Sequence, residues 1–344
     1  MTDETAVPTE QSPLEQSPPL QTSPVQTPLR LIFAGSPGAA VPSLIALAAT
    51  AHDIVAVLTR EDSEQGRKRI LTATPVSDVA QAHGIPVIKS NRLAGAATDA
   101  ITALDADLGV IVAYGGLLRE PLLSAPRLGW INLHFSLLPR WRGAAPVQRS
   151  LIAGDDLTGG TVFQLVAELD AGEIYGQFTQ TVNPNDTTGD LLASLADAGA
   201  QLLTRVVAAL ADGTARGETQ KGDVTLAPKL SLADGKIVWT ADAATVHNQI
   251  RGVTPEPGAF TTVDGARIKV LAARIALPDQ ARAERPALPL APGHLRFESP
   301  RVLIGTATDP LELMTVQPAA KKPMPAADWW RGRNASADAA VVAE

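Results

Sequence analysis

The sequence predicts an α/β domain whose sheet contains parallel strands, followed by a smaller OB-like β-barrel domain. Two observations carry this prediction. In the first half of the chain, apolar runs typical of buried strands alternate with helix-compatible segments, which favours a parallel sheet covered on both faces. In the second half, short strand-like runs follow one another with one short helix. The length of 344 residues is sufficient for two cores.

The first domain begins at Leu29, and its expected strands and helices alternate along the chain. Glycines close the first strand-like run, Pro75 stands where a helix is expected to begin, and Gly84 stands where that helix ends. The expected strands are LRLIFAGSPG, DIVAVLT, IPVIK, DLGVIVAYGG and GWINLH. The expected helices are VPSLIALAAT, PVSDVAQAHG and a segment near residues 95–104.

A strand pair and a long helix complete this domain. Two strand-like runs are joined by a turn at residues 169–172. A single amphipathic helix then runs from Thr188 to Gly213. We therefore expect the first domain to span residues 29–213, and residues 214–228 to form a linker.

The second domain is expected over residues 229–333. ADAATVHNQIRGV is typical of a short helix, and Asp264-Gly265 lies in the turn of a predicted hairpin. The strand-like runs that follow are HLRFES, RVLIGTA and LELMTVQPA. Residues 334–344 are expected to be a tail.

Composition narrows the classes of function. The chain has no cysteine, which excludes a disulfide framework, thiolate metal ligands and a cysteine nucleophile. The formal charge of −7 gives no general attraction to phosphate, so a nucleic-acid partner would need local basic patches. Residues 1–28 are rich in Pro, Gln, Ser and Thr, and we expect them to be disordered.

The sequence also bears on location. No run approaches the roughly 18 apolar residues of a membrane span, and the N-terminus lacks the pattern of a signal peptide. We therefore expect a cytoplasmic protein with no membrane partner. Separately, we expect the protein to be a monomer.

Three strand ends are expected to meet in one crevice. Ligands of parallel sheets bind beyond the carboxyl ends of the strands. Gly35-Ser36, the run Tyr114-Gly115-Gly116 and residues 132–134 all fall at such ends. The crevice is therefore the place to look for chemistry.

An amide and an imidazole stand two residues apart at one of these ends. Asn132 and His134 point to the same side, because side-chain direction in a strand has a period of two. The amide can donate a hydrogen bond to a developing oxyanion, and the imidazole can take a proton from an attacking amine. Asp170, in a turn flanked by small residues, is a candidate to orient the imidazole and favour its charged form.

This combination indicates acyl transfer to an amine without a covalent enzyme intermediate, since the chain has neither a cysteine nor a G-x-S-x-G elbow. The spacing alone also fits a structural pair of hydrogen-bonding side chains. Surface or structural roles fit the other histidines, which lie near predicted turns or on a short helix. No compact metal-ligand spacing occurs, so we expect no metal site.

Several motifs resemble the folate-dependent formyltransferases. They are Asn132-Leu133-His134, the SLLP run that begins at Ser136, its RWRGAAP extension, and LDAG at residues 169–172. With FAGSP, VAYG and QPAAKKPMPAADWWRG, the resemblance covers about residues 29–333. The RWRGAAP extension and the second domain resemble the branch of this family that acts on tRNA.

The resemblance implies a Rossmann-like first domain and an OB-like second domain. It implies transfer of a formyl group from 10-formyltetrahydrofolate to the α-amino group of methionyl initiator tRNA, with no metal. Asn132 would stabilise the oxyanion, His134 would assist proton transfer, and Asp170 would position His134. The implied folate-site residues are Ser136, Leu137, Leu138, Pro139, Val112, Ala113, Tyr114 and Gly115.

The loop after the second strand is the predicted tRNA contact. Arg67, Lys68 and Arg69 follow a glycine in a long connection on the ligand side of the sheet. Their charges would neutralise phosphates of the acceptor stem. The alternative is a solvated basic loop. A second basic cluster beside Trp329-Trp330 fits core packing of the tryptophans as well as it fits RNA contact.

Three departures separate the chain from the usual family pattern. LDAG is followed by Glu173, where the family usually has Leu-Asp-Thr-Gly-Asp. PEPG at residues 255–258 replaces Pro-Trp-Pro-Gly, which removes an aromatic contact. The segment before the basic loop is more acidic than in the family.

Three other functions stay open at this point. A formyltransferase acting on a small amine, such as a nucleotide-linked amino sugar, would not depend on charged tRNA. A nicotinamide-dependent oxidoreductase fits Gly35-x-x-Gly38 after the first strand, but the G-x-G-x-x-G pattern is incomplete. A noncatalytic tRNA-binding module predicts that His134→Ala has no effect.

Overall fold

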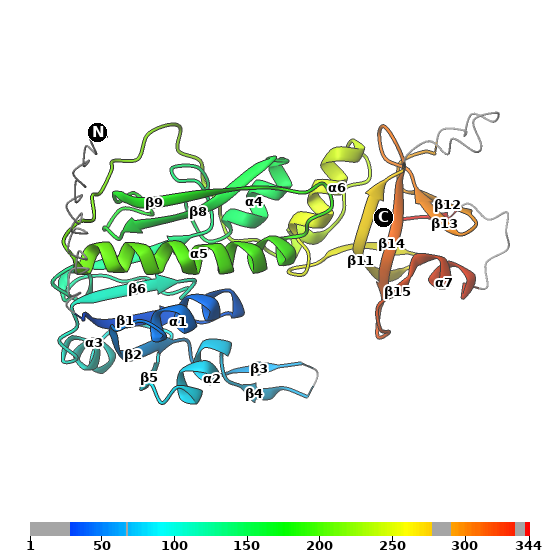
Figure 1. The fold of residues 1–344 in the computed structure, drawn as a ribbon. Helices are drawn as coiled ribbons and strands as arrows, with labels where there is room; N and C mark the ends of the chain where they lie inside the picture. The colour runs from blue at the N-terminus through cyan, green and yellow to red at the C-terminus, as the bar shows by residue number, and fades with distance from the viewer. Residues whose placement is uncertain (1–27, 67, 277–289, 334–340) are drawn as a thin grey trace, which may run out of the picture.

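The computed structural model describes residues 28–66, 68–276, 290–333 and 341–344. Figure 1 shows an α/β domain beside a smaller domain built mainly of strands, as the sequence predicts. Most of the expected disordered extension and part of the expected tail lie outside the described residues.

A seven-stranded sheet forms the first domain, in the order β5-β2-β1-β6-β7-β8-β9. The pairs from β5 to β7 are parallel, and β8 and β9 extend the sheet with antiparallel pairs. The central strand β6 is buried at every position, and its neighbours β1 and β7 are buried at all but one, because most of their side chains are apolar on both faces. The bounds are β1 (Arg30–Gly35), β2 (Asp53–Thr59), β5 (Val87–Lys89), β6 (Leu108–Val112), β7 (Trp130–His134), β8 (Leu157–Gln164) and β9 (Ile174–Thr181).

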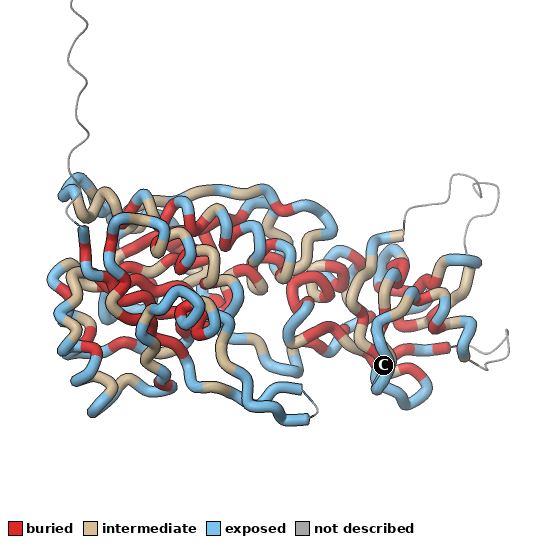
Figure 2. The backbone as a smooth tube through the Cα atoms, turned by 60° about the horizontal axis from the view of Figure 1, so that its bottom comes forward, coloured by how far each residue is buried: buried red, intermediate tan, exposed pale blue. Residues whose placement is uncertain are grey.

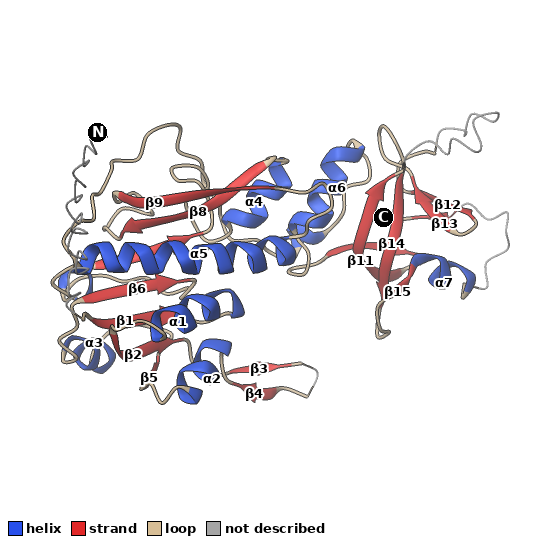
Figure 3. Cartoon of the chain, viewed as in Figure 1, coloured by secondary structure: helices blue, strands red, loops and turns tan. Residues whose placement is uncertain are grey.

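Helices cover both faces of this sheet, and α5 is the longest of those described. A capping box starts α5: the Thr187 hydroxyl accepts the Asp190 N–H, and the Asp190 carboxylate accepts the Thr187 N–H. Figure 3 shows α5 running alongside the strands, between β6 and β8 in this view. The bounds are α1 (Val41–Ala48), α2 (Pro75–Ala82), α3 (Ala96–Thr102), α4 (Pro146–Ala153) and α5 (Thr188–Ala211).

By length and composition alone, α5 meets the criterion for a helix that crosses a membrane, contrary to the sequence expectation. Half of its most apolar window is buried inside the molecule, and a core helix passes the same test. Its contacts explain the composition. At Gly199, an added Cβ would come within 2.7 Å of a Leu133 methyl carbon, so this helix packs closely on β7.

The basic loop after β2 contains a hairpin that the sequence analysis did not predict. β3 (Ser63–Gln65) pairs with β4 (Ile70–Thr72), and both strands are exposed along their whole length. Because these strands bury little apolar surface, their sequence carries no alternating pattern to reveal them.

A seven-stranded antiparallel sheet forms the second domain; six strands follow the order β10-β11-β14-β13-β12-β16, and β15 pairs with β14 beside them. It is preceded by α6, and its core is separate from that of the first domain. Figure 2 shows the two groups of buried segments, one in each domain. The bounds are α6 (Ala243–Gly252), β10 (Ala259–Val263), β11 (Ala266–Ile275), β12 (His294–Glu298), β13 (Arg301–Ile304), β14 (Leu311–Pro318), β15 (Met324–Pro325), α7 (Ala326–Arg331) and β16 (Val341–Val342).

Residues 341–344 close this sheet into a barrel, which corrects the expectation of a tail. β16 pairs with β12, and Thr262 of β10 exchanges two backbone hydrogen bonds of 2.9 Å with Glu344. The first and last strands of the order are thereby joined. The segment is too short for a strand to be predicted from its pattern.

Trp329 and Trp330 pack within the second domain. Trp329 belongs to its core, and the Trp330 ring stacks on Phe297 with 6.0 Å between centroids. The guanidinium of Arg333 lies over both indole rings. These contacts favour core packing of the tryptophans over a free aromatic surface.

Two glycines allow the domains to approach closely at α4 and α6. A Cβ at Gly154 would lie 2.7 Å from the amide nitrogen of Asn248, and one at Gly252 would lie 2.6 Å from an Ile152 side-chain carbon. Gly154 also has a φ of 80°, which suits the end of α4. The second domain is therefore docked directly on the first.

Candidate functional site

The expected crevice forms at the carboxyl ends of β1, β6 and β7. The Ser36 hydroxyl donates a 3.2 Å hydrogen bond to the carbonyl of Tyr114, which joins the first two strand ends. The Arg60 guanidinium donates a 2.8 Å hydrogen bond to the carbonyl of Gly115. β6 and β7 are direct neighbours, so these ends lie beside Asn132 and His134.

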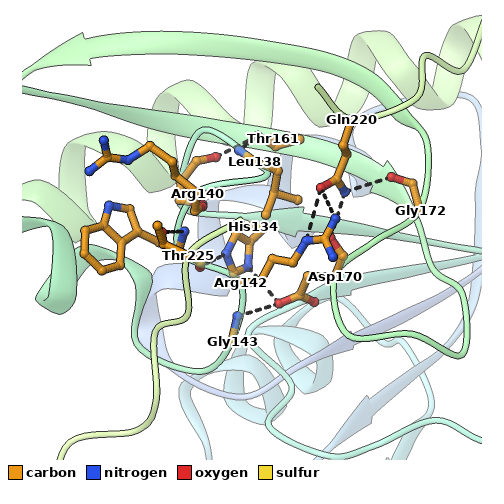
Figure 4. Close-up of polar contacts among 12 residues, drawn as sticks. His134, Leu138, Arg140, Arg142, Gly143, Thr161, Asp170, Gly172, Gln220 and Thr225 are labelled. Atoms are coloured by element: carbon orange, nitrogen blue, oxygen red, sulfur yellow. Dashed lines mark hydrogen bonds and ion pairs between the residues drawn. The ribbon is translucent and has the colours of Figure 1, made fainter. Parts of the chain in front are cut away.

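His134 is almost completely buried, with 6% of its surface exposed. Its Nε2 lies 2.8 Å from the carbonyl oxygen of Trp141, as Figure 4 shows. Because a carbonyl can only accept, Nε2 must carry the proton. The other ring nitrogen, Nδ1, lies 3.8 Å from Oδ2 of Asp170. In the neutral ring, Nδ1 is therefore the atom that can take up a proton.

Two opposing effects set the proton affinity of His134. Burial lowers the pKa of His134, while the Asp170 carboxylate and the Trp141 carbonyl raise it. Burial is the larger effect, so the pKa lies below its usual value. The ring is neutral at neutral pH, and the nearby carboxylate stabilises the imidazolium when it forms.

Asp170 is held in an unusual backbone conformation. Its φ is 46°, in the left-handed region that non-glycine residues rarely adopt. Its Oδ2 accepts a 2.7 Å hydrogen bond from the backbone N–H of Gly143, so one oxygen faces both this donor and His134. The structure thus brings His134 and Asp170 together.

Asn132 is half-buried on β7, one pleat before His134. Its side-chain amide has no hydrogen bond to any part of the chain that the structure describes. A half-buried amide without a protein partner is available to donate to a ligand. This is the arrangement that oxyanion stabilisation requires, and a structural hydrogen-bonding pair does not account for it.

The residues implied for the folate site have unequal access to the crevice. Val112 and Tyr114 belong to the core, and the Tyr114 hydroxyl donates to the carbonyl of Ser90 at 2.7 Å. Ala113 lies between these two residues and Gly115 follows Tyr114. Both are exposed, and their φ angles are 49° and 77°. Of the four residues implied for the folate site at this strand end, Ala113 and Gly115 are the exposed ones.

Ser136, Leu138 and Pro139 are buried, and Leu137 is half-buried. Side chains from β8 and β9 anchor this loop. The Thr161 hydroxyl donates to the Ser136 carbonyl at 2.6 Å, and the Gln177 amide donates to the Leu138 carbonyl at 3.0 Å. The loop is therefore fixed from beneath by the antiparallel part of the sheet.

A cavity of about 320 Å³ is lined in part by the same loop. Asp155 connects two other residues that line the cavity. Its carboxylate accepts two hydrogen bonds from Arg140 and one of 2.7 Å from the Trp141 indole. This fixes Trp141, whose carbonyl accepts the hydrogen bond from the Nε2–H of His134. The lining residues are Leu137, Arg140, Trp141, Asp155, Asp156, Leu157 and Thr158.

The expected linker takes part in the site, which the sequence analysis missed. The Thr225 hydroxyl accepts the Trp141 N–H at 2.9 Å, and Gln220 contacts both Arg142 and the Asp170 turn. Segment 214–228 has neither helical nor strand periodicity and contains none of the motifs that resemble the family. Only a pairing between distant segments places it here.

The predicted tRNA loop is exposed at the β3–β4 hairpin. Arg67 lies outside the described residues. Lys68 is exposed, and Arg69 forms an ion pair with Glu64 across the hairpin. In the described part of the chain, no group of three or more His, Asp or Glu side chains is arranged to hold a metal ion.

Comparison with known protein families gives two matches. Residues 29–207 match the family described as Formyl transferase. Residues 229–334 match the family described as Formyl transferase, C-terminal domain. The two matches cover both domains of the structure.

Curated relatives share about half of their residues with this chain. A methionyl-tRNA formyltransferase of Clavibacter michiganensis subsp. michiganensis is 54% identical over 304 residues, covering 88% of this chain and 97% of the relative. One of Leifsonia xyli subsp. xyli is 54% identical over 309 residues, covering 90% of this chain and 99% of the relative.

Solved structures share the fold at lower identity. An N-formyltransferase from Helicobacter canadensis has a TM-score of 0.63 and 17% identity, covering 83% of this chain and 98% of its own. The sugar 3N-formyl transferase WlaRD has a TM-score of 0.61 and 15% identity, covering 86% of this chain and 99% of its own. At these identities the likeness concerns the fold alone.

Proposed function

The chain belongs to the formyl transferase family, and from this membership we propose that it transfers a formyl group from 10-formyltetrahydrofolate to the α-amino group of methionyl initiator tRNA. The identity of 54% to methionyl-tRNA formyltransferases over nearly their whole length supports this acceptor. The product is N-formylmethionyl-tRNA for translation initiation. We place the reaction in the cytoplasm and expect a monomer to carry it out.

The observation that carries the chemistry is the unpartnered amide of Asn132 beside the buried His134–Asp170 pair. Attack of the amine on the formyl carbon forms a C–N bond and places negative charge on the formyl oxygen. Asn132 donates its N–H to that oxygen. Such a donor, placed by a strand of the sheet in a partly water-excluded site, stabilises the transition state more than it stabilises the substrate.

His134 handles the proton of the attacking amine. Its Nδ1 accepts that proton as the new C–N bond forms, and Asp170 stabilises the resulting imidazolium at 3.8 Å. Breaking the bond between the formyl carbon and N10 of the folate releases an amine that needs a proton. His134 returns the proton to that nitrogen, so the enzyme ends in its starting state.

The roles of the folate and tRNA segments follow from their exposure. Ala113 and Gly115 supply open backbone at the crevice edge, which suits a flat pterin ring. Lys68 and Arg69 stand on an exposed hairpin on the ligand side of the sheet, which suits phosphate contact.

Transfer of radiolabelled formyl from 10-formyltetrahydrofolate to initiator methionyl-tRNA tests the proposal. Free methionine and uncharged tRNA serve as controls. Label on the charged tRNA alone supports the proposed acceptor. Folate binding without any labelled tRNA would instead favour a small amine acceptor, such as a nucleotide-linked amino sugar.

A further inference from the structure

We propose that Gln220, in the segment that joins the two domains, is a positioning residue that sets the geometry of the His134–Asp170 pair. The inference rests on the proposed function, because it concerns the same reaction. Gln220 contacts neither of these two side chains. It acts through the backbone of the Asp170 turn and through Arg142.

The Gln220 amide uses both of its ends (Figure 4). Its Nε2 donates to the carbonyl of Asp170 at 2.7 Å and to the carbonyl of Gly172 at 2.9 Å. Its Oε1 accepts from the Arg142 guanidinium, at 2.7 Å from Nη2 and 3.2 Å from Nε. The side chain is half-buried and its hydrogen-bonding capacity is fully used, so it has one defined orientation.

The two hydrogen bonds from Gln220 fix the turn at residues 169–172, which is also tightly packed on its opposite side. On the other side of the turn, a Cβ at Gly172 would lie only 1.7 Å from the carbonyl oxygen of Gln164. The turn is therefore held between β8 and Gln220. This support maintains the left-handed backbone of Asp170, which directs its carboxylate toward Nδ1 of His134.

Arg142 connects Gln220 to the second partner of that carboxylate. The backbone N–H of Arg142 donates to the Thr225 carbonyl at 2.9 Å. The backbone carbonyl of Arg142 accepts a hydrogen bond from the Ala227 N–H at 2.7 Å. The next residue, Gly143, donates its N–H to Oδ2 of Asp170. Gln220 thus ties together the two backbone segments that supply the carboxylate and its hydrogen-bond donor.

Only an amide satisfies both ends of this arrangement. Glutamate would keep the pairing with Arg142 but would turn an acceptor toward two carbonyl oxygens. Alanine would remove every contact. A displacement of about 1 Å in a reacting group can cost about 100-fold in rate, so loss of this support should lower turnover strongly.

Gln249 provides a matched control in the second domain. It is also half-buried, and its Nε2 donates to two backbone carbonyls, those of Asp234 at 3.0 Å and Lys236 at 2.8 Å. Its Oε1 accepts from the Val238 N–H at 3.4 Å, and among the described residues none of its hydrogen bonds reaches the crevice. Gln249→Ala removes the same kind of contact at a site without chemistry.

The experiment measures kcat and both KM values for the wild-type protein and for Gln220→Ala, Gln220→Glu and Gln249→Ala. We expect both Gln220 variants to lose about tenfold or more in kcat, with each KM within about threefold of wild type, since the support acts on the reacting groups rather than on binding. Gln249→Ala should keep its kcat. An unchanged kcat in Gln220→Ala, or an equal loss in Gln249→Ala, would overturn the inference.

A double-mutant cycle with Asp170→Asn separates positioning from a general loss of structure. If Gln220 acts through Asp170, Gln220→Ala should cost much less in the Asp170→Asn background than in wild type. Fully additive losses would contradict the inference. A wild-type protein that transfers no formyl group to methionyl-tRNA would count against the proposed function instead, so the two failures are distinguishable.

Discussion

Each domain buries one histidine against a backbone carbonyl, and the two side chains differ in what faces their free nitrogen. His134 contacts the Trp141 carbonyl at 2.8 Å, and His247 on α6 contacts the Ala273 carbonyl at 3.1 Å. Their exposed fractions are 6% and 8%. Only His134 has a carboxylate opposite its other nitrogen.

The charged groups beside the two rings have opposite effects on their pKa values. Asp170 raises the pKa of His134 against the effect of burial, whereas the Arg251 guanidinium adds to burial in lowering the pKa of His247. A ring that must gain and lose a proton needs a nearby group that tolerates its charged form. In the described part of the chain no carboxylate offsets the burial of His247, so burial alone does not mark a catalytic histidine.

The largest expected effect separates the two histidines by substitution. His134→Ala should lower turnover by about 100-fold or more, because it removes the proton acceptor. His247→Ala should leave turnover per folded molecule near wild type and lower only the thermal stability of the second domain. Steady-state kinetics combined with calorimetry checks both results. Comparable losses of turnover in the two variants would remove the distinction.

The next prediction concerns Asn132, the proposed hydrogen-bond donor to the oxyanion. Asn132→Ala should lower turnover by roughly 100-fold, because removing a single oxyanion donor typically lowers kcat by about that factor. Asn132→Asp keeps the size but removes the donors, so we expect a loss at least as large. Binding of methionyl-tRNA should change little in either variant. Turnover close to wild type in the aspartate variant would mean that the amide donates nothing in the reaction.

The titration of the two rings should respond differently to Asp170. Burial lowers both pKa values, so both rings should take up protons below the ordinary value of about 6.5. Asp170→Asn removes a charge that raises the pKa of His134, so its midpoint should move further down while that of His247 stays. NMR of histidine-labelled protein can follow this, because the chain has only 5 histidines.

The same shifts predict a loss of stability in acid. Where the folded pKa lies below the unfolded one, the unfolded chain binds more protons, so stability falls as pH drops below about 6.5. Urea unfolding at several pH values would reveal the trend. A His134 midpoint at or above about 6.5 in the titration would contradict both statements.

The smallest expected effect concerns binding rather than chemistry. Lys68→Glu on the exposed hairpin should raise KM for charged tRNA several-fold and leave kcat unchanged. The slope of log affinity against log salt should decrease by about 1 if one phosphate contact is lost. Glu218→Gln, an exposed change in the linker, serves as a control. An unchanged slope would exclude Lys68 from the tRNA interface.

Local patterns were sufficient to predict most of the fold. Alternating apolar runs and glycine or proline boundaries located the strands from β1 to β9, apart from the β3–β4 hairpin, whose strands are too exposed to carry a pattern. The closing strand β16 was missed because it consists of only two residues. Barrel closure depends on pairing with a distant strand.

The candidate site was predicted in part. The period of a strand placed Asn132 and His134 on one side, and a turn of small residues drew attention to Asp170. The separation of 3.8 Å between His134 and Asp170 required the fold, because 35 residues intervene between them. Gln220 carried no local signal at all.

The sequence alone determined which chemical groups this protein can use: no thiol, an amide and an imidazole at a strand end, and basic residues in a long loop. Tertiary structure decided which of those groups meet and which nitrogen of His134 is free. Pairing of the 214–228 segment with the loop after β7 made a connecting segment part of the site. The reason is physical, because side-chain periodicity is encoded locally, whereas contacts between distant segments depend on the packing of the whole domain.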